Sequence, residues 1–326
     1  MQDGVVNIDK PPGWTSHDVV AKIRGLLRLK KVGHAGTLDP EATGVLLICF
    51  GKGTKAVPFL MNTEKEYEVV LRLGEETDTE DATGKVVRAC EVPAGLDGRI
   101  RETLESFVGT YDQIPPMYSA VKVRGVPLYR SARAGKTVER MPRSVTIREI
   151  RFDRIEGKDV YFSVVCSKGT YVRTLCADIG AKLGVGGHLL RLRRRRSGRF
   201  HVSDAIALSR FLELCSEGAW EREAHSLSDI FTDLPAVRIH DLYRKRVKHG
   251  APFGREGVLE WDFFKKGAFL RLVDSEEVVV AVASAILNRD EIKNSKEVFF
   301  KIETVLTEID SEIDSKVKRV PTPLSI

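Results

Sequence analysis

Residues 30–55 read KKVGHAGTLDPEATGVLLICFGKGTK, a glycine-rich polar stretch followed by an apolar run. A Walker phosphate loop is excluded, because Gly53 stands where that loop needs Ser or Thr. Two compatible interpretations of Asp39 remain open. In the first, Asp-Pro-Glu starts a helix and Asp39 is its N-cap. In the second, the preceding glycines shape a loop that presents Asp39 as a catalytic carboxylate.

Length and composition describe a basic globular protein. The 326 residues suffice for two domains, and a net charge of +6 with a pI near 9.0 favours a polyanionic partner. The longest apolar run, residues 278–287, is about half a membrane span, and the first ten residues lack the apolar core of a signal peptide. The five cysteines form no Cys-x-x-Cys pair, and the histidines show no metal-ligand spacing. We therefore expect a reduced, cytoplasmic protein without a metal.

Strand and helix patterns alternate irregularly along residues 1–234. Residues 65–74 alternate apolar and polar positions, with Tyr67 on the apolar face, so they predict a strand and a core tyrosine. Residues 15–29 have helical spacing with an N-cap signature at Ser16, and residues 171–183 form a second helical stripe that ends before Gly184. The absence of a regular βαβ rhythm indicates an α+β fold.

The remainder of the chain changes in texture. Residues 234–306 carry short alternating runs and glycine-rich turns, which predict a small, mainly β second domain. Residues 311–326 read as a polar tail.

Two segments concentrate positive charge. Residues 191–199 hold six arginines in nine positions, so they form either a solvated face or a surface that contacts phosphates. Residues 122–143 hold seven Lys or Arg against one acid. Glycines interrupt this second segment, which is either a mobile arm that grips nucleic acid or an ordinary exposed insertion. Arg173 also stands out, because its charge opposes the dipole at the start of its helix unless an acid or phosphate lies beside it.

Six segments together resemble the TruB-type tRNA pseudouridine synthases. They read NIDKPPGWTSHDVV, GHAGTLDPEATGVLLICFGKGTK, KEYEV, QIPPMYSAVKVRGVPLYRSAR, SKGTYVRTLCADIG and GGHLLRLRRRRSGRF, and they span residues 4 to about 210 in order. The resemblance implies a pseudouridine synthase fold over residues 1–234, with a mixed, mainly antiparallel sheet flanked by helices. Residues 122–143 would be an insertion that grips RNA. Residues 235–310 resemble, less closely, a PUA domain, which is a small RNA-binding β-barrel.

The resemblance also implies roles for individual residues. Asp39 matches the catalytic aspartate, Tyr67 the tyrosine stacked on the target base, and Arg173 the arginine that pairs with the catalytic carboxylate. The implied substrate-binding residues are His34, Tyr171, Leu192 and Lys10, the last in a motif that packs beside the active site. The arginines expected to contact the RNA backbone are Arg193, Arg194, Arg195, Arg196, Arg124, Arg130 and Arg133.

The implied reaction converts uridine-55 in the TΨC loop of tRNA to pseudouridine, after the base has been flipped out. This isomerisation moves no net electrons and breaks no phosphate ester, so we expect neither a cofactor nor a metal. Asp39 acts either as a nucleophile at C1′ or as a base toward the 2′ proton. We expect a monomer whose partner is the TΨC stem-loop of tRNA. We expect it to need no guide RNA and no obligatory protein partner, and not to bind a membrane.

Two other functions fit the same residues. One is an RNA-binding or RNA-folding module whose catalysis is incidental. The other is a related synthase that acts on a different RNA uridine.

Overall fold

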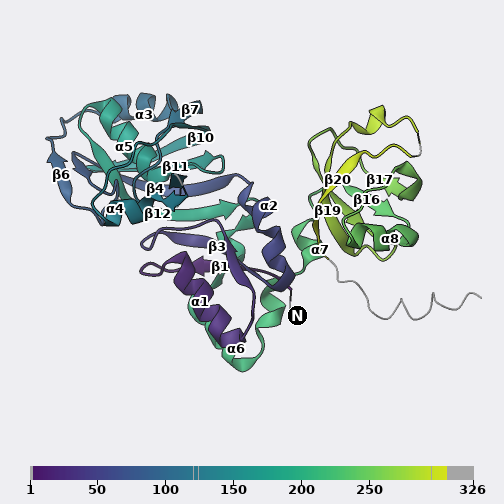
Figure 1. The fold of residues 1–326 in the computed structure, drawn as a ribbon. Coiled ribbons are helices and arrows are strands. Elements are labelled where there is room, and N and C mark those ends of the chain that lie inside the picture. The colour runs from purple at the N-terminus through teal and green to yellow at the C-terminus, as the bar shows by residue number, and fades with distance from the viewer. Residues whose placement is uncertain (1–2, 120, 124, 295, 307–326) are drawn as a thin grey trace, which may run out of the picture. The chain divides into compact units, whose positions relative to one another are not determined.

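The computed structural model describes residues 3–119, 121–123, 125–294 and 296–306, and it divides into a larger and a smaller compact unit (Figure 1). The larger unit comprises Val6–Cys49 and Val57–Ala224. The smaller unit comprises Met1–Val5, Phe50–Ala56 and His225–Ile326. Residues 311–326, which we expect to be a polar tail, lie outside the described residues.

A mixed sheet forms the centre of the larger unit. Its main path runs β14 (Ile206–Ala207), β1 (Gly4–Lys10), β3 (Thr43–Phe50), β12 (Gly187–Ser197), β4 (Lys65–Leu73), β11 (Asp159–Cys166), β10 (Arg143–Glu156) and β7 (Gly109–Gln113). The additional strands β2 (Val32–Ala35), β13 (Phe200–His201) and β15 (Ala224–His225) pair with β3, β12 and β1. The β1–β14 and β3–β12 pairs are parallel, whereas the pairs from β12 to β7 are antiparallel. The α+β class and the mixed sheet are thereby confirmed.

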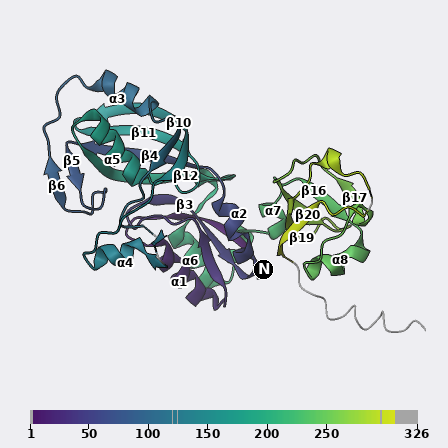
Figure 2. The same ribbon diagram turned by 45° about the horizontal axis from the view of Figure 1, so that its top comes forward.

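Helices pack on this sheet and at its ends. They are α1 (Ser16–Leu27), α2 (Val57–Met61), α3 (Asp97–Glu105), α4 (Leu128–Arg133), α5 (Val172–Leu183) and α6 (Leu208–Glu217), with 3₁₀ turns η2 (Val202–Asp204) and η3 (Trp220–Glu223). α5 contacts β12 and β4, and α3 contacts β10 and α5, so these two helices cover one face of the antiparallel part (Figure 2). Two small hairpins, β5 (Glu75–Thr77) with β6 (Val86–Ala89) and β8 (Lys122–Val123) with β9 (Val126–Pro127), complete the unit.

The clearest sequence patterns are confirmed. Tyr67 is buried with the apolar face of β4, and α5 ends at Gly184, whose positive φ of 83° suits glycine. The expected N-cap of α1 is wrong by one residue. Thr15 forms a reciprocal capping box with Asp18, while the Ser16 side chain turns into the protein.

The helix that Asp-Pro-Glu predicts does not form. The carbonyl group of Asp39 accepts a hydrogen bond from the amide of Ala42 at 3.1 Å, which closes a tight turn, and β3 begins at Thr43. Proline at the second position suits this turn. The residues that follow are buried strand residues, so pairing in the sheet outweighs the local helix signal.

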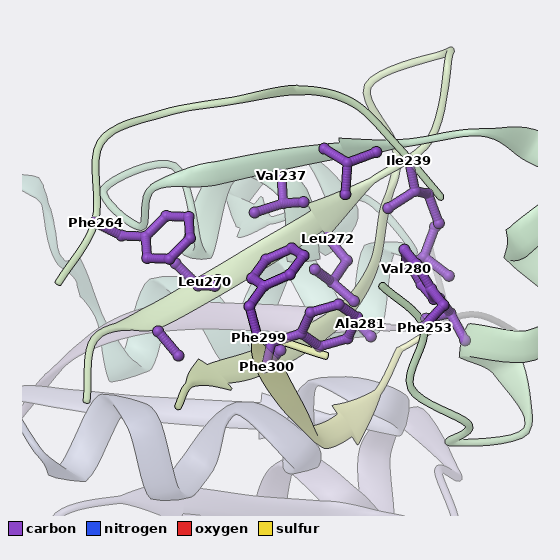
Figure 3. Close-up of a cluster of buried hydrophobic side chains, with 14 residues drawn as sticks. Val237, Ile239, Phe253, Phe264, Leu270, Leu272, Val280, Ala281, Phe299 and Phe300 are labelled. Atoms are coloured by element: carbon purple, nitrogen blue, oxygen red, sulfur yellow. The ribbon is translucent and has the colours of Figure 1, made fainter. Parts of the chain in front are cut away.

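The smaller unit has its own sheet, ordered β17 (Val258–Trp261), β16 (Ala236–Ile239), β18 (Phe269–Val273), β19 (Val279–Ala285) and β20 (Phe300–Val305). The unit also contains α7 (Leu227–Ile230), α8 (Asp241–Lys248), η1 (Gly51–Ala56), η4 (Arg255–Gly257) and η5 (Arg289–Glu291). Buried phenylalanines at 253, 264, 299 and 300 pack with aliphatic residues of β16, β18 and β19 (Figure 3). This cluster supplies a hydrophobic core, as a separate domain requires.

Within the described ranges, none of the helices has the length and apolar character that crossing a membrane requires.

Candidate active site

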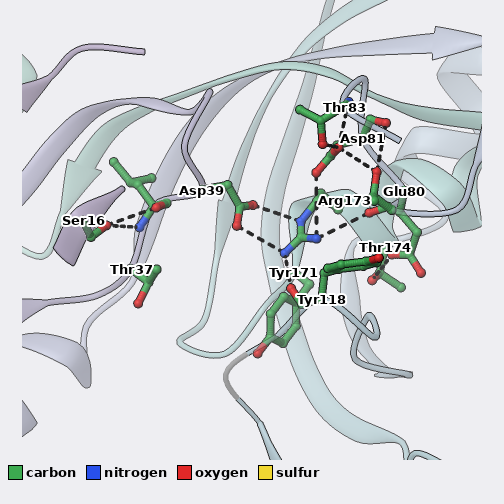
Figure 4. Close-up of polar contacts among 12 residues, drawn as sticks. Ser16, Thr37, Asp39, Glu80, Asp81, Thr83, Tyr118, Tyr171, Arg173 and Thr174 are labelled. Atoms are coloured by element: carbon green, nitrogen blue, oxygen red, sulfur yellow. Dashed lines mark hydrogen bonds and ion pairs between the residues drawn. The ribbon is translucent and has the colours of Figure 1, made fainter. Parts of the chain in front are cut away.

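Arg173 and Asp39 form a two-point ion pair between the first turn of α5 and the loop that precedes β3. Arg173 Nε lies 2.9 Å from Asp39 Oδ2, and Nη2 donates to Oδ1 at 3.2 Å (Figure 4). Such bidentate pairing fixes both the position and the plane of a carboxylate. The Arg173 side chain is 6% exposed and that of Asp39 is 39% exposed. The pair therefore offers a carboxylate to the surroundings while its cation stays buried.

Other segments hold the same guanidinium. Nη2 donates to the carbonyl of Tyr118 at 2.9 Å and Nη1 to that of Thr79 at 3.4 Å, while Asp81 Oδ2 lies 3.8 Å from Nη1. Figure 4 shows Arg173 between the carboxylates of Asp39 and Asp81. Carboxylates thus lie beside Arg173, as its unfavourable position at the positive end of a helix predicts.

The surroundings change the acidity of Asp39. Part of the side chain opens outward, but protein encloses most of the carboxyl group, and this burial raises its pKa above the ordinary value of 3.8. The charge of Arg173 opposes the rise, Asp81 adds to it, and Lys10 weakly opposes it. As the pH falls, Asp39 therefore takes up a proton at a higher pH than an exposed aspartate would. The charge of Arg173 makes this difference smaller.

Lys10 supports the loop of Asp39 from inside the protein. Its Nζ donates to the carbonyls of Pro11, Trp14 and Pro40 at 2.8, 2.7 and 2.8 Å, and the residue is 0% exposed. Burial lowers its pKa to about 8. All three of these contacts are to backbone of the scaffold, and a role of Lys10 in substrate binding stays a prediction.

Ser16 supports the other side of the same loop. Its hydroxyl accepts from the amide of Leu38 at 2.8 Å and donates to the carbonyl of Leu38 at 3.0 Å. Leu38 and Pro40 flank Asp39, so the catalytic candidate stands on backbone that is fixed on both sides.

Arg194 is also part of the scaffold. It is 1% exposed, and its guanidinium donates to the carbonyls of Val45, Gly36 and Thr37 at 2.6, 3.0 and 3.4 Å. Its side chain lies beneath the loop that leads to Asp39, so contact of Arg194 with the RNA backbone stays a prediction that this placement does not support. Its place on β12 directs it inward, unlike its neighbours in the sequence.

The neighbouring arginines are partly exposed and paired with acids. Arg193 Nη2 lies 2.7 Å from Asp9, Arg195 Nη1 lies 3.4 Å from Glu68, and Arg196 Nε lies 3.2 Å from Glu66. Arg130 is exposed on α4. Arg124 and the side chain of Arg133 lie outside the described residues.

A groove of about 1490 Å³ opens beside the Asp39 carboxylate. Its walls include Asp39, Arg173, Asp81, Tyr118 and Leu192, which the sequence places far apart. The structure thus brings the expected Asp39, Arg173 and Leu192 to one cavity. A hollow of this size can hold an extended segment of a substrate.

The remaining expected residues are Tyr67, which is buried, and His34 and Tyr171, which are half-buried, and none of the three is among the described residues that line the groove. Tyr67 is 8% exposed, and burial raises the pKa of its phenol while the charge of Arg194 opposes that rise. His34 lies on β2, and burial together with the charges of Arg194 and His17 lowers the pKa of its imidazole. Tyr171 is the residue directly before α5 and precedes Arg173 by two positions.

Asp81 and Tyr118 are site residues that the sequence patterns did not identify. The acidic stretch EETDTED reads as a solvated hairpin turn, yet Asp81 is only 18% exposed in its side chain. The sequence signal is only that this stretch is rich in acids, and nothing in the pattern singles out Asp81. Tyr118 contributes through its backbone carbonyl, which no side-chain pattern can reveal.

Comparison with known proteins identifies the family of the chain. The model for the N-terminal domain of the TruB family pseudouridylate synthases matches residues 24–172, and that for the C-terminal domain of tRNA pseudouridylate synthase B matches residues 173–236. The tRNA pseudouridine synthase B of Geobacter sulfurreducens is 45% identical over 87% of this chain and 94% of its own length. That of Thermotoga maritima is 42% identical over 88% and 92%.

A solved structure shows the same fold. A chain in the crystal structure of a Cbf5–Nop10–Gar1 complex superposes with a TM-score of 0.76 at 32% identity, covering 94% of this chain and 86% of that one. Matches at this identity and coverage extend beyond the fold to the family. The chain belongs to the TruB family of pseudouridylate synthases.

Proposed function

We propose that this protein isomerises uridine-55 in the TΨC loop of tRNA to pseudouridine, with Asp39 as the essential carboxylate. The observation that carries the proposal is the Asp39–Arg173 pair, whose carboxylate opens on the groove while its cation is buried. The relatives named tRNA pseudouridine synthase B support the same reaction and the same kind of substrate.

The chemistry requires one positioned carboxylate. The N1–C1′ bond breaks, the uracil turns, and a C5–C1′ bond forms, so the product has the same atoms as the substrate. Asp39 serves either as a nucleophile at C1′ or as a base that takes the 2′ proton, and both roles need its ionised form. Arg173 supplies the charge that favours ionisation in a partly buried site.

The target base must leave the RNA stack before it can reach Asp39, which costs a few kcal/mol. We propose that Tyr67, Tyr171 and Leu192 receive the flipped uracil, and that His34 fills the space it leaves. In the protein alone, burial and the nearby charges lower the pKa of His34, which favours its neutral imidazole. Ring stacking against bases offsets part of the cost of flipping.

The rest of the RNA is held by basic residues on the surface. We assign this role to Arg193, Arg195, Arg196 and Arg130, and also to Arg124 and Arg133. Residues 1–234 would be the catalytic domain and residues 235–310 a PUA domain that also contacts RNA. The separate phenylalanine core and the basic α8 support that division. The protein would act in the cytoplasm as a monomer, without a guide RNA or a protein partner.

The test is to incubate the purified protein with tRNA, without any cofactor, and to map pseudouridine at each position. The wild type should modify uridine-55, and Asp39→Ala should reduce the rate by at least ~10³-fold. Asp97→Asn changes an exposed carboxylate on α3 and is the matched control, which should keep the normal rate.

Three outcomes would contradict the proposal. The wild type forms no pseudouridine, or Asp39→Ala forms it normally, or the product appears at another uridine. Asp39→Ala should also keep its affinity for tRNA. An RNA-folding module would in addition keep its cellular role in that variant, so complementation by Asp39→Ala separates this alternative from an enzyme.

A further inference from the structure

Gln113, the last residue of β7, makes hydrogen bonds with both backbone groups of Tyr171. Its Oε1 accepts from the amide of Tyr171 at 2.8 Å, and its Nε2 donates to the carbonyl of Tyr171 at 3.0 Å. Nε2 also donates to the hydroxyl of Tyr111 at 2.6 Å. Gln113 is 1% exposed, so its amide is committed to these contacts.

Tyr171 is the point where α5 begins. It is the N-cap of α5 with extended φ and ψ of −97° and 108°, and within the described residues its own side chain makes no capping bond. Its carbonyl accepts the first helical hydrogen bond, from Leu175 at 3.0 Å. A helix start leaves backbone donors that need partners from elsewhere. The side chain of Gln113 therefore acts as a cap for α5. By holding the backbone of Tyr171, it fixes the position and direction in which α5 starts.

The start of α5 carries the cation of the catalytic pair. Arg173 follows Tyr171 by two residues, and its guanidinium is held by the carbonyl of Tyr118 at 2.9 Å. Gln113 ends β7 and Tyr118 follows it by five residues, so both belong to the short segment 113–118. This segment therefore contacts the start of α5 at two places, the backbone of Tyr171 and the side chain of Arg173.

We propose that Gln113 is a positioning residue for the Arg173–Asp39 pair, which it orients by fixing the backbone of Tyr171. The inference rests on the proposed function, because it concerns the geometry of the same catalytic carboxylate. A displacement of about 1 Å by a residue outside the reacting centre can reduce a rate by about 10²-fold. The role requires an amide, since one side chain must both accept from and donate to the same peptide unit.

Gln113→Met is the decisive variant, because methionine has a similar length and lacks the donors and the acceptor. We expect kcat to fall by about 10- to 100-fold, while KM and the Kd for tRNA stay within about twofold. The acid limb of the kcat profile should move to higher pH, since a displaced Arg173 holds the charge of Asp39 less well. Thr110→Val is the matched control, because it removes an exposed β7 hydrogen bond to Thr146 that does not reach α5.

Two results would overturn the inference. If the folded Gln113→Met protein keeps the normal kcat and loses only thermal stability, Gln113 merely supports the fold. If KM rises and kcat is unchanged, it acts on RNA binding. Wild-type protein that makes no pseudouridine would reject the proposed function instead, so the two failures are distinguishable.

If Gln113→Met does not fold, a second variant, Tyr111→Phe, can still test the inference. Tyr111→Phe keeps both bonds to Tyr171 and removes the hydroxyl that orients the amide. We expect kcat to fall by about threefold with no change in KM, which is a smaller change in the same direction. An unchanged kcat in Tyr111→Phe would then overturn the inference.

Discussion

Arg173 and Arg194 are both buried guanidinium groups in the same unit, yet their surroundings differ. Arg173 is 5% exposed as a whole residue, and its guanidinium lies beside the carboxylates of Asp39 and Asp81. Arg194 is 1% exposed and bonds to backbone carbonyls, with no ion pair to an acid among the described residues. Burial of a basic side chain alone therefore does not identify a catalytic site. A partner carboxylate that opens on a groove is the feature that makes Arg173 and Asp39 candidates for the catalytic site.

Of the two arginines, Arg173 should have the larger effect on the reaction when it is replaced. In Arg173→Gln, kcat should fall by about 10²- to 10³-fold at neutral pH, because a donor that fixes and charges Asp39 is lost. Arg173 normally lowers the Asp39 pKa against the effect of burial, so its removal raises that pKa further and moves the acid limb to higher pH. Single-turnover rates over a pH series would measure both changes.

This prediction has a clear opposite outcome. A rate within about threefold of wild type and an unmoved acid limb would mean that Arg173 does not control the charge of Asp39. Circular dichroism should show that the variant is folded, since a loss of fold would explain inactivity without any role in the chemistry.

Replacing Arg194 should affect stability more than the reaction. Arg194→Met leaves the carbonyls of Gly36, Thr37 and Val45 without their buried donor. Lost bonds of this kind cost about 1–3 kcal/mol each, and removal of an unpaired buried charge offsets part of that, so we expect a net loss of about 2–4 kcal/mol. Denaturant unfolding would measure this loss.

Arg195→Met is the matched control for stability, since Arg195 is adjacent, about half exposed and paired with Glu68. Its effect should stay within about 0.5 kcal/mol, as for most exposed ion pairs. If Arg194→Met unfolded at the same denaturant concentration as this control, the scaffold role of Arg194 would be refuted.

The two arginines also show how far the sequence alone could lead. Periodicity sufficed for β4 and α5, because each buries one regular face. The helix dipole pointed to an acid beside Arg173. Neither pattern could find Asp81 or Tyr118, since these residues meet Arg173 only when segments 92 and 55 positions away from it come together.

The run of arginines on β12 was harder to interpret for a different reason. Alternation along a strand would separate neighbouring side chains onto opposite faces, but β12 has irregular pairing with β4 between Leu189 and Arg191 and between Arg194 and Arg196. Which arginine turns inward then depends on where the loop of Gly36 packs. Likewise, Asp-Pro-Glu fits both a helix start and a turn, and only the pairing of β3 in the sheet decides between them.

The smallest expected effect extends the comparison to exposed arginines. Arg191 lines the groove, donates to the hydroxyl of Tyr161 at 3.1 Å and has no ion pair to an acid among the described residues, whereas Arg195 pairs with Glu68. Arg191→Gln should reduce the slope of log Kd for tRNA against log salt by about 0.7, the value for one released phosphate contact. Arg195→Gln should change it by less than half as much, because Glu68 already balances that charge. Equal losses would instead mean that Glu68 releases Arg195 when RNA binds, and a carboxylate partner would then no longer mark an exposed arginine as unavailable to the substrate.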